Sequence, residues 1–143
     1  MGGGISQNQL SERLLYAFPH IITWLENDLN DIEQLVFDGT QSPIEQIDDL
    51  FNQYVTNQDL SYYEKSHSMR PDNLGVWELK TPDVRIFGWF NKKGVFIIAE
   101  IASAFHCKQH NLYAGYRGGV VRRRDDLMLD EPKYIIGDYR DVL

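Results

Sequence analysis

The sequence predicts an α+β domain in which N-terminal helices pack against an antiparallel β-meander. Apolar residues recur every three or four positions in the first third of the chain, which is typical of amphipathic helices. Between Asn73 and Ile101, three runs of β-favouring residues follow one another, separated by the turn signals Thr81-Pro82-Asp83 and Asn91-Lys92-Lys93-Gly94. Strands joined by such short turns pair as antiparallel neighbours.

The first helical region precedes Asp38. Pro19 lacks a backbone donor and clashes with the preceding turn of a helix, so we expect a kink or break near Phe18. Two helical pieces at about 8–17 and 19–36 satisfy the pattern, and one bent helix satisfies it as well. The apolar positions on which this rests are Leu10, Leu14, Phe18, Ile21, Leu25, Leu29, Ile32 and Val36.

A second helix begins at Ser42-Pro43-Ile44-Glu45. This segment offers an N-cap hydroxyl, a proline at the first helical position and a glutamate three residues after the cap. The helix has one apolar face and one polar face, and we expect the polar face to be solvated. The apolar face contains Ile44, Ile47, Leu50, Phe51 and Tyr54, and the polar face contains Glu45, Gln46, Asp49 and Asn52.

The meander has two distinguishable faces, because successive strand residues point to opposite sides. In the middle strand, Val84 and Ile86 share one side, while Arg85 lies on the other side with aromatic neighbours. The third strand, Val95 to Ile101, is apolar except for Glu100, so we expect it to be the best-buried strand.

The chain after Ile101 has a weaker pattern. We expect Phe105 to Lys108 to continue as a strand or a loop, and Gly118-Gly119 to make a turn before a short strand at Val120-Val121. Tyr134 to Ile136 is helical or extended. The whole chain 1–143 is expected to form a single domain, with a helical portion at 1–56, a connector at 57–73 and a sheet portion with a tail at 74–143.

Composition and charge limit the function classes. Cys107 is the only cysteine, which excludes an intrachain disulfide and favours the cytoplasm. No apolar run is long enough to span a bilayer, so no membrane association is expected. The net charge of −7 is unevenly distributed: residues 1–66 carry −9 and residues 67–143 carry +2, and within the second part residues 80–124 carry +7. This asymmetry indicates either a basic face for a polyanion or attraction between the two halves of the fold.

A group of cations surrounds the meander, and these are our candidate catalytic residues. Lys80 ends the first strand, Arg85 lies on the second, and His106 and Lys108 follow the third. Fixed cations bind phosphate, and histidine exchanges protons near neutral pH. Trp89, Tyr113 and Tyr116 offer stacking surfaces for unpaired bases. The alternative is a solvated sheet edge whose long basic side chains lie over apolar surface.

Further candidates for RNA binding lie downstream, at Arg117 and at Arg122, Arg123 and Arg124. The three adjacent arginines either contact RNA or pair with the nearby carboxylates of the chain. His106-Cys107 and His110 have a spacing typical of metal ligands, but the sequence offers no second Cys/His pair, so we expect neither a metal nor another cofactor.

Two motifs, Trp77-Glu78-Leu79-Lys80 and Val84-Arg85-Ile86-Phe87, follow the helices and precede the apolar third strand. In this order the segment 43–108 resembles the HigB/RelE superfamily of toxin–antitoxin toxins, in particular its phage-derived branch. The resemblance implies a RelE-like α+β fold and endoribonuclease activity on mRNA, usually on the ribosome and restrained by an antitoxin. It implies that the 2′-hydroxyl of the RNA is the nucleophile.

The same resemblance implies that Arg85 stabilises phosphate charge with Lys80 beside it, and that His106 and Lys108 are functional. On this hypothesis, Arg85→Ala abolishes growth arrest and leaves thermal stability nearly unchanged. The chain departs from the family in its acidity and its long helical start. The alternative function is therefore a non-catalytic, phage-related interaction module, with N-terminal helices that mediate homodimerisation or partner binding.

Overall fold

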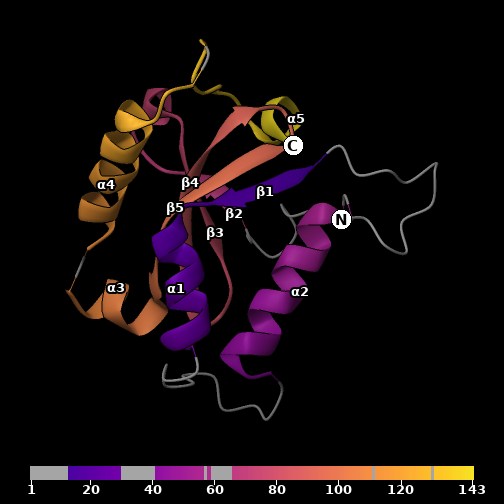
Figure 1. Cartoon of the computed structure of the whole chain (residues 1–143), viewed down its shortest axis with the longest axis vertical. Coiled ribbons are helices and arrows are strands. Elements are labelled where there is room, and N and C mark those ends of the chain that lie inside the picture. Colours follow the sequence, from indigo (N-terminus) through magenta and orange to yellow (C-terminus); the bar gives the residue numbers. More distant parts are fainter. Residues whose placement is uncertain (1–12, 30–40, 57, 59–65, 111, 130) are drawn as a thin grey trace.

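The computed structural model describes residues 13–29, 41–56, 58, 66–110, 112–129 and 131–143, and these form an α+β fold with helices on both faces of one mixed sheet (Figure 1). The strand order is β1-β5-β4-β3-β2. The strands are β1 (Leu14–Ala17), β2 (Ser66–Ser68), β3 (Val76–Lys80), β4 (Val84–Lys92) and β5 (Val95–Ser103). The helices are α1 (Pro19–Asn27), α2 (Pro43–Val55), α3 (Ala104–His110), α4 (Tyr113–Asp126) and α5 (Tyr139–Val142), with a short 3-10 turn at Asp72–Leu74.

The predicted meander is confirmed. Strands β3, β4 and β5 pair in antiparallel order, and Lys80 lies opposite Arg85 in the β3–β4 register. Ile86 packs in one core with α1 and α2, whereas Phe87 and Trp89 pack in a second core with α3 and α4. Each face of the sheet is therefore covered by its own pair of helices, and β5 is buried except at Glu100 and Ser103.

The predicted helix at 8–17 is wrong over its described part, because Leu14–Ala17 is the strand β1. It pairs in parallel with β5, and the amide N–H of Leu14 donates to the Gly94 carbonyl at 2.7 Å. A short apolar run such as Leu14–Ala17 is compatible with a strand as well as with a helix. Here the run forms a strand because it can pair with the edge of β5. The expected break near Phe18 is confirmed, since Phe18 is the N-cap of α1. Residues 8–12 and 30–36 lie outside the described residues.

The predicted second helix is confirmed as α2. The Glu45 amide donates to Ser42 Oγ at 3.3 Å, and the Ser42 amide donates to Glu45 Oε1 at 3.0 Å, which completes the capping box. Two positions differ from the expected faces. Ile44 is 41% exposed, whereas Gln46 is 4% exposed and exchanges hydrogen bonds with Asp83.

The C-terminal part differs most from the prediction. Residues 104–110 form the helix α3 rather than a strand or loop, and the expected strand at Val120-Val121 lies inside the helix α4. Gly119 explains the second error: it lies in a helix where a Cβ would be 2.6 Å from Glu100 Oε2, so its role is close packing and not a turn. Sequence reasoning also missed β2 within the connector, and α5.

The segment Tyr134 to Ile136, predicted to be helical or extended, is not helical. The Ile135 amide donates a hydrogen bond to the Phe90 carbonyl at 2.9 Å. In the part of the chain that the structure describes, no helix combines the length and apolar character needed to cross a membrane.

Candidate functional site

An open cavity of about 730 Å³ lies where β2, the β3–β4 hairpin, α3 and the start of α4 meet. We call it the basic cavity. It brings together five of the residues that the sequence nominated: Lys80, Arg85, Lys108, Tyr113 and Arg117. The remaining described lining residues are His67, Ser68, Met69, Arg70 and Glu78.

Arg85 is the most constrained cation of the basic cavity. Only 7% of the residue is exposed, and its Nη1 donates to the carbonyls of Thr81 and Val84. Its Nε lies 3.6 Å from Glu78 Oε2. Arg85 is therefore held by the chain itself. In place of nearly unchanged stability in Arg85→Ala, we now expect a loss, because the substitution leaves a buried carboxylate without this partner.

His67 and Glu78 form the part of the basic cavity that sequence reasoning missed. The two residues are opposite one another in the β2–β3 register, and His67 Nε2 contacts Glu78 Oε1. The other ring nitrogen, Nδ1, lies 3.2 Å from the Ser68 carbonyl. Both partners are acceptors, so the ring is best satisfied when both nitrogens carry protons. The only available signal was a histidine in a short β-compatible run ahead of the meander.

The electrostatics follow from this geometry. The hydrogen bond to Glu78 raises the pKa of His67 above its ordinary value, and partial burial opposes this effect. Glu78 is 3% exposed, and its Oε2 accepts no hydrogen bond from the described residues. Glu78 is also the only carboxylate among the described residues that line the cavity, so cations dominate its surface.

The other cations of the basic cavity are more accessible. Lys108 is exposed on α3, and Lys80 is half-buried at the end of β3. Arg117 on α4 donates from Nη1 to the Arg70 carbonyl at 2.6 Å, which fixes its position over β2. Lys80, Lys108 and Arg117 can therefore donate hydrogen bonds to an anion in the cavity without any rearrangement of the backbone.

The aromatic candidates divide between cavity and core. The Tyr113 ring packs against Phe87 with centroids 6.0 Å apart and lines the basic cavity. Tyr116 stacks on the same Phe87 ring at 5.1 Å, outside the described lining. Trp89 is fully buried, and its Nε1 donates to the Lys133 carbonyl at 3.0 Å. A base can therefore stack on Tyr113 but cannot reach Trp89.

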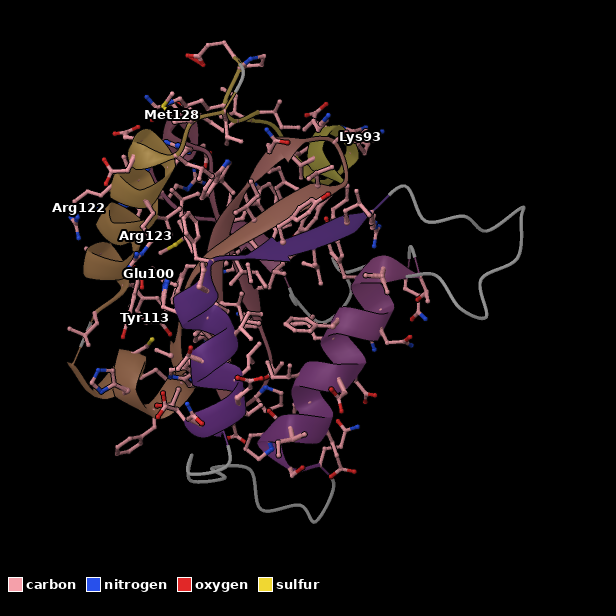
Figure 2. The ribbon with its side chains drawn as sticks, viewed as in Figure 1. Lys93, Glu100, Tyr113, Arg122, Arg123 and Met128 are labelled. Atoms are coloured by element: carbon pink, nitrogen blue, oxygen red, sulfur yellow. The ribbon has the colours of Figure 1, made fainter. Side chains whose placement is uncertain are left out.

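His106 and the three adjacent arginines lie away from the basic cavity. His106 is exposed on α3 and is not among its described lining residues. Arg122 is exposed and points away from the sheet, whereas Arg123 faces Glu100 with Nε 3.0 Å from Oε2 (Figure 2). Arg124 is 3% exposed and donates to the Leu74 carbonyl. Intrachain contacts therefore occupy two of the three.

The structure offers no metal centre in its described part, where no group of three or more potential ligands among His, Cys, Asp and Glu exists. The side chain of His110 lies outside the described residues. Burial raises the pKa of the Cys107 thiol to about 11, so this thiol is protonated at neutral pH and is a poor nucleophile.

Comparisons with protein-family models, curated protein sequences and solved structures find no match for this chain. The geometry of the basic cavity is therefore the basis for any functional assignment.

Proposed function

We propose that the chain is a RelE/HigB-like, toxin-type mRNA endoribonuclease. The observation that carries the proposal is the gathering of Lys80, Arg85, Lys108, Arg117 and a doubly hydrogen-bonded His67 around one open cavity. Such a set of fixed donors in a hollow favours a polyanion and stabilises negative charge that develops during a reaction.

Phosphate binding falls to the accessible cations. Lys80, Lys108 and Arg117 donate to the non-bridging oxygens of the scissile phosphate and its neighbour, and Tyr113 offers a stacking surface for an unpaired base. Arg85, held behind them, adds a fixed positive charge without needing to move. The charge on the phosphate rises in the transition state, so these donors stabilise it more than the ground state.

Proton transfer to the leaving group falls to His67, whose side chain is 44% exposed and is held by the buried Glu78 carboxylate. The 2′-hydroxyl of the RNA attacks the adjacent phosphorus and gives its proton to solvent water. The bond from phosphorus to the 5′-oxygen breaks, and the His67 imidazolium gives its proton to that oxygen. The products are a 2′,3′-cyclic phosphate and a free 5′-hydroxyl, and no metal or other cofactor takes part.

The family assignment is supported by the order of the elements that carry its motifs. Glu78 and Lys80 lie on β3, Arg85 lies on the antiparallel neighbour β4, and β5 leads into the helix that carries Lys108. We extend the proposal to ribosome-bound mRNA as the substrate, an antitoxin protein as the partner and the cytoplasm as the location.

The test uses the purified full chain and an end-labelled, mixed-sequence RNA, with and without ribosomes. Wild type is expected to release fragments that end in a 2′,3′-cyclic phosphate. A substrate with a 2′-deoxynucleotide at the cleavage position should stay intact. The double variant Lys80→Ala with Lys108→Ala should lose at least about a hundredfold in rate, the scale seen when transition-state donors are removed.

Lys93→Ala is the matched control, because this exposed lysine lies beyond the opposite end of β4 (Figure 2). It should cleave as fast as wild type. Intact RNA after incubation with the wild-type chain, with and without ribosomes, contradicts the proposal. So does a cleavage rate in the double variant that equals that of the control.

A second candidate function, an interaction module, is favoured by a groove of about 720 Å³ along β1 and β5. Its walls are mainly apolar and include Val95, Ile97 and Leu129, and Tyr16 is 54% exposed beside them. Among the described strands, β1 pairs only with β5, so no described strand occupies its other edge, and such an edge can pair with another strand. The apolar faces of α1 and α2 are instead used in the core.

Light scattering tests this candidate with a second copy of the chain as the partner. A homodimer through the groove has about twice the chain mass of 16.7 kDa, and Tyr16→Asp should return it to one chain mass. Ile22→Asp, on the outward face of α1, is the control and should not change the mass. A wild-type monomer at high protein concentration would exclude this homodimer.

A further inference from the structure

A second cavity, of about 410 Å³, adjoins the basic cavity and shares Lys80 and Arg85 with it. It lies between α2 and the turn that connects β3 with β4, so the two cavities meet at the end of that hairpin. An RNA strand whose phosphate occupies the basic cavity therefore has a neighbouring space for one of its bases.

The lining of the second cavity differs from that of the first. In place of several cations it presents amide and carboxylate groups from α2 and the preceding turn, namely Gln41, Gln46, Asp49 and Gln53. Leu50 and Pro82 supply apolar surface for the flat face of a ring. Such a mixture of a few polar groups on apolar walls is typical of a site that reads a small, planar ligand.

Two of these polar groups are held in place by contacts on the protein. Gln46 donates from Nε2 to Asp83 Oδ2 at 2.7 Å and accepts the Asp83 amide at 2.9 Å, so its orientation is fixed. Asp49 accepts from Gln41 Nε2 through Oδ2. Asp49 therefore lines the cavity with a carboxylate that Gln41 helps to orient.

We propose that this second cavity is a guanine subsite in which Asp49 reads the base. The inference rests on the proposed ribonuclease function and adds a base preference to it. The Watson–Crick edge of guanine presents two adjacent donors, N1–H and the N2 amino group, beside the acceptor O6. A carboxylate can take both donors at once. The Lys80 ammonium has three N–H donors, so it can give one to O6 while another remains on the phosphate.

The other bases fit this lining less well. Adenine and cytosine each offer one amino donor beside a ring acceptor, which faces a carboxylate oxygen unfavourably. Uracil offers one N–H between two carbonyl acceptors. Of these bases, only guanine satisfies both an acceptor-only group and a donor-only group in the same cavity. A base that offers only one donor makes one hydrogen bond fewer to the Asp49 carboxylate than guanine does, and it therefore binds more weakly.

The test measures binding of short, 2′-O-methylated oligouridylates, which cannot be cleaved, with one central guanine, inosine, adenine or uracil. Inosine is guanine without the N2 amino group, so it removes one of the two donors. We expect wild type to bind the guanine oligonucleotide about tenfold more tightly than the others, the scale of a good bidentate contact. Asp49→Asn should reduce this preference to near unity.

Asp48→Asn is the matched control, because Asp48 is the exposed neighbour on α2, lies outside the cavity lining and carries the same charge. It should keep the guanine preference. Equal wild-type affinity for all four oligonucleotides, or a preference that survives in Asp49→Asn, overturns the guanine subsite alone. Absence of binding to every oligonucleotide speaks instead against the proposed ribonuclease function.

Discussion

At the residue scale, Glu78 on β3 lies between His67 on β2 and Arg85 on β4 and interacts with both. Its carboxylate contacts His67 through one oxygen and lies near Arg85 Nε through the other, while only 3% of the residue is exposed. A buried carboxylate needs compensating partners, since burial favours its neutral form. The two cations meet that requirement, and in return Glu78 fixes where both of them lie.

Arg85→Ala is expected to lower the free energy of unfolding by about 3 kcal/mol, because it removes one partner of a buried ion pair and the hydrogen bond that Arg85 donates to the Thr81 carbonyl. Urea unfolding measures this change. The control is Lys108→Ala, at an exposed position, which should stay within about 0.5 kcal/mol of wild type. Equal stability of the two variants contradicts the role assigned to Arg85.

His67 predicts a pH dependence of stability. Its pKa is raised in the folded chain, so the stabilisation from its contact with Glu78 is fully present below the ordinary histidine value of about 6.5 and is lost as pH rises through the folded value. His67→Gln should therefore cost more stability in mildly acidic than in mildly alkaline solution. The difference should stay below about 1 kcal/mol, because the side chain is 44% exposed.

Unfolding experiments on both proteins across this pH range measure the effect, and titration of the His67 ring by NMR gives its pKa directly. Glu78→Gln removes the cause of the raised pKa and should return the ring toward its ordinary value. A wild-type titration at or below that ordinary value would refute the assignment of His67 as a proton-carrying cation.

At the element scale, the close approach of β4 and β5 leaves no space for a side chain at Gly88, where their register changes. Strands β4 and β5 shift register between Phe87 and Gly88, and a Cβ at Gly88 would lie 2.0 Å from the Ile97 carbonyl oxygen. The nearest atoms belong to the Ile97 backbone and to the buried Phe96 ring, so no flexible side-chain end is there to move aside.

Gly88→Ala is therefore expected to destabilise the fold by about 3 kcal/mol, since the strands must separate to admit a methyl group. Gly115→Ala is the comparison, because Gly115 lies in α4 with nothing within 4 Å of its ideal Cβ, and should stabilise the chain by about 0.5–1 kcal/mol. Thermal and urea unfolding distinguish the two. A stabilised Gly88→Ala protein would show that the close approach is absent.

At the scale of the whole molecule, an acidic chain presents a local basic surface. The net charge of the chain is −7, yet most of the charged residues that line the basic cavity are lysines and arginines. Long-range repulsion from the acidic helices opposes RNA, whereas contact with the cavity favours it. Binding should therefore be local, engaging few phosphates.

RNA binding by the wild-type chain should weaken with salt at a slope of about −2 in a log–log plot, as expected when Lys80, Lys108 and Arg117 contact about three phosphates of a single strand. Lys108→Ala should make the slope shallower by about 0.7, whereas Lys93→Ala should not change it. Fluorescence anisotropy over a salt series measures both. A slope near zero would mean that phosphate contacts do not drive binding.

Local patterns determined much of this fold. The capping box at Ser42 and Glu45, the alternation of Val84, Arg85 and Ile86, and the apolar run of β5 act over a few residues, so they could be predicted without knowing any partner. The closeness of Lys80 and Arg85 also followed, because adjacent strands joined by a short turn must lie side by side. Lys108 instead lies on α3, a helix that the sequence did not predict.

Only the tertiary structure decided the rest. Leu14–Ala17 is a strand because β5 offers it a free edge, and Gly119 remains in a helix because α4 must approach Glu100 closely. His67 reaches Glu78 only once β2 pairs with β3. Each of these outcomes depends on contacts between residues far apart in the chain, whose energies no local periodicity encodes.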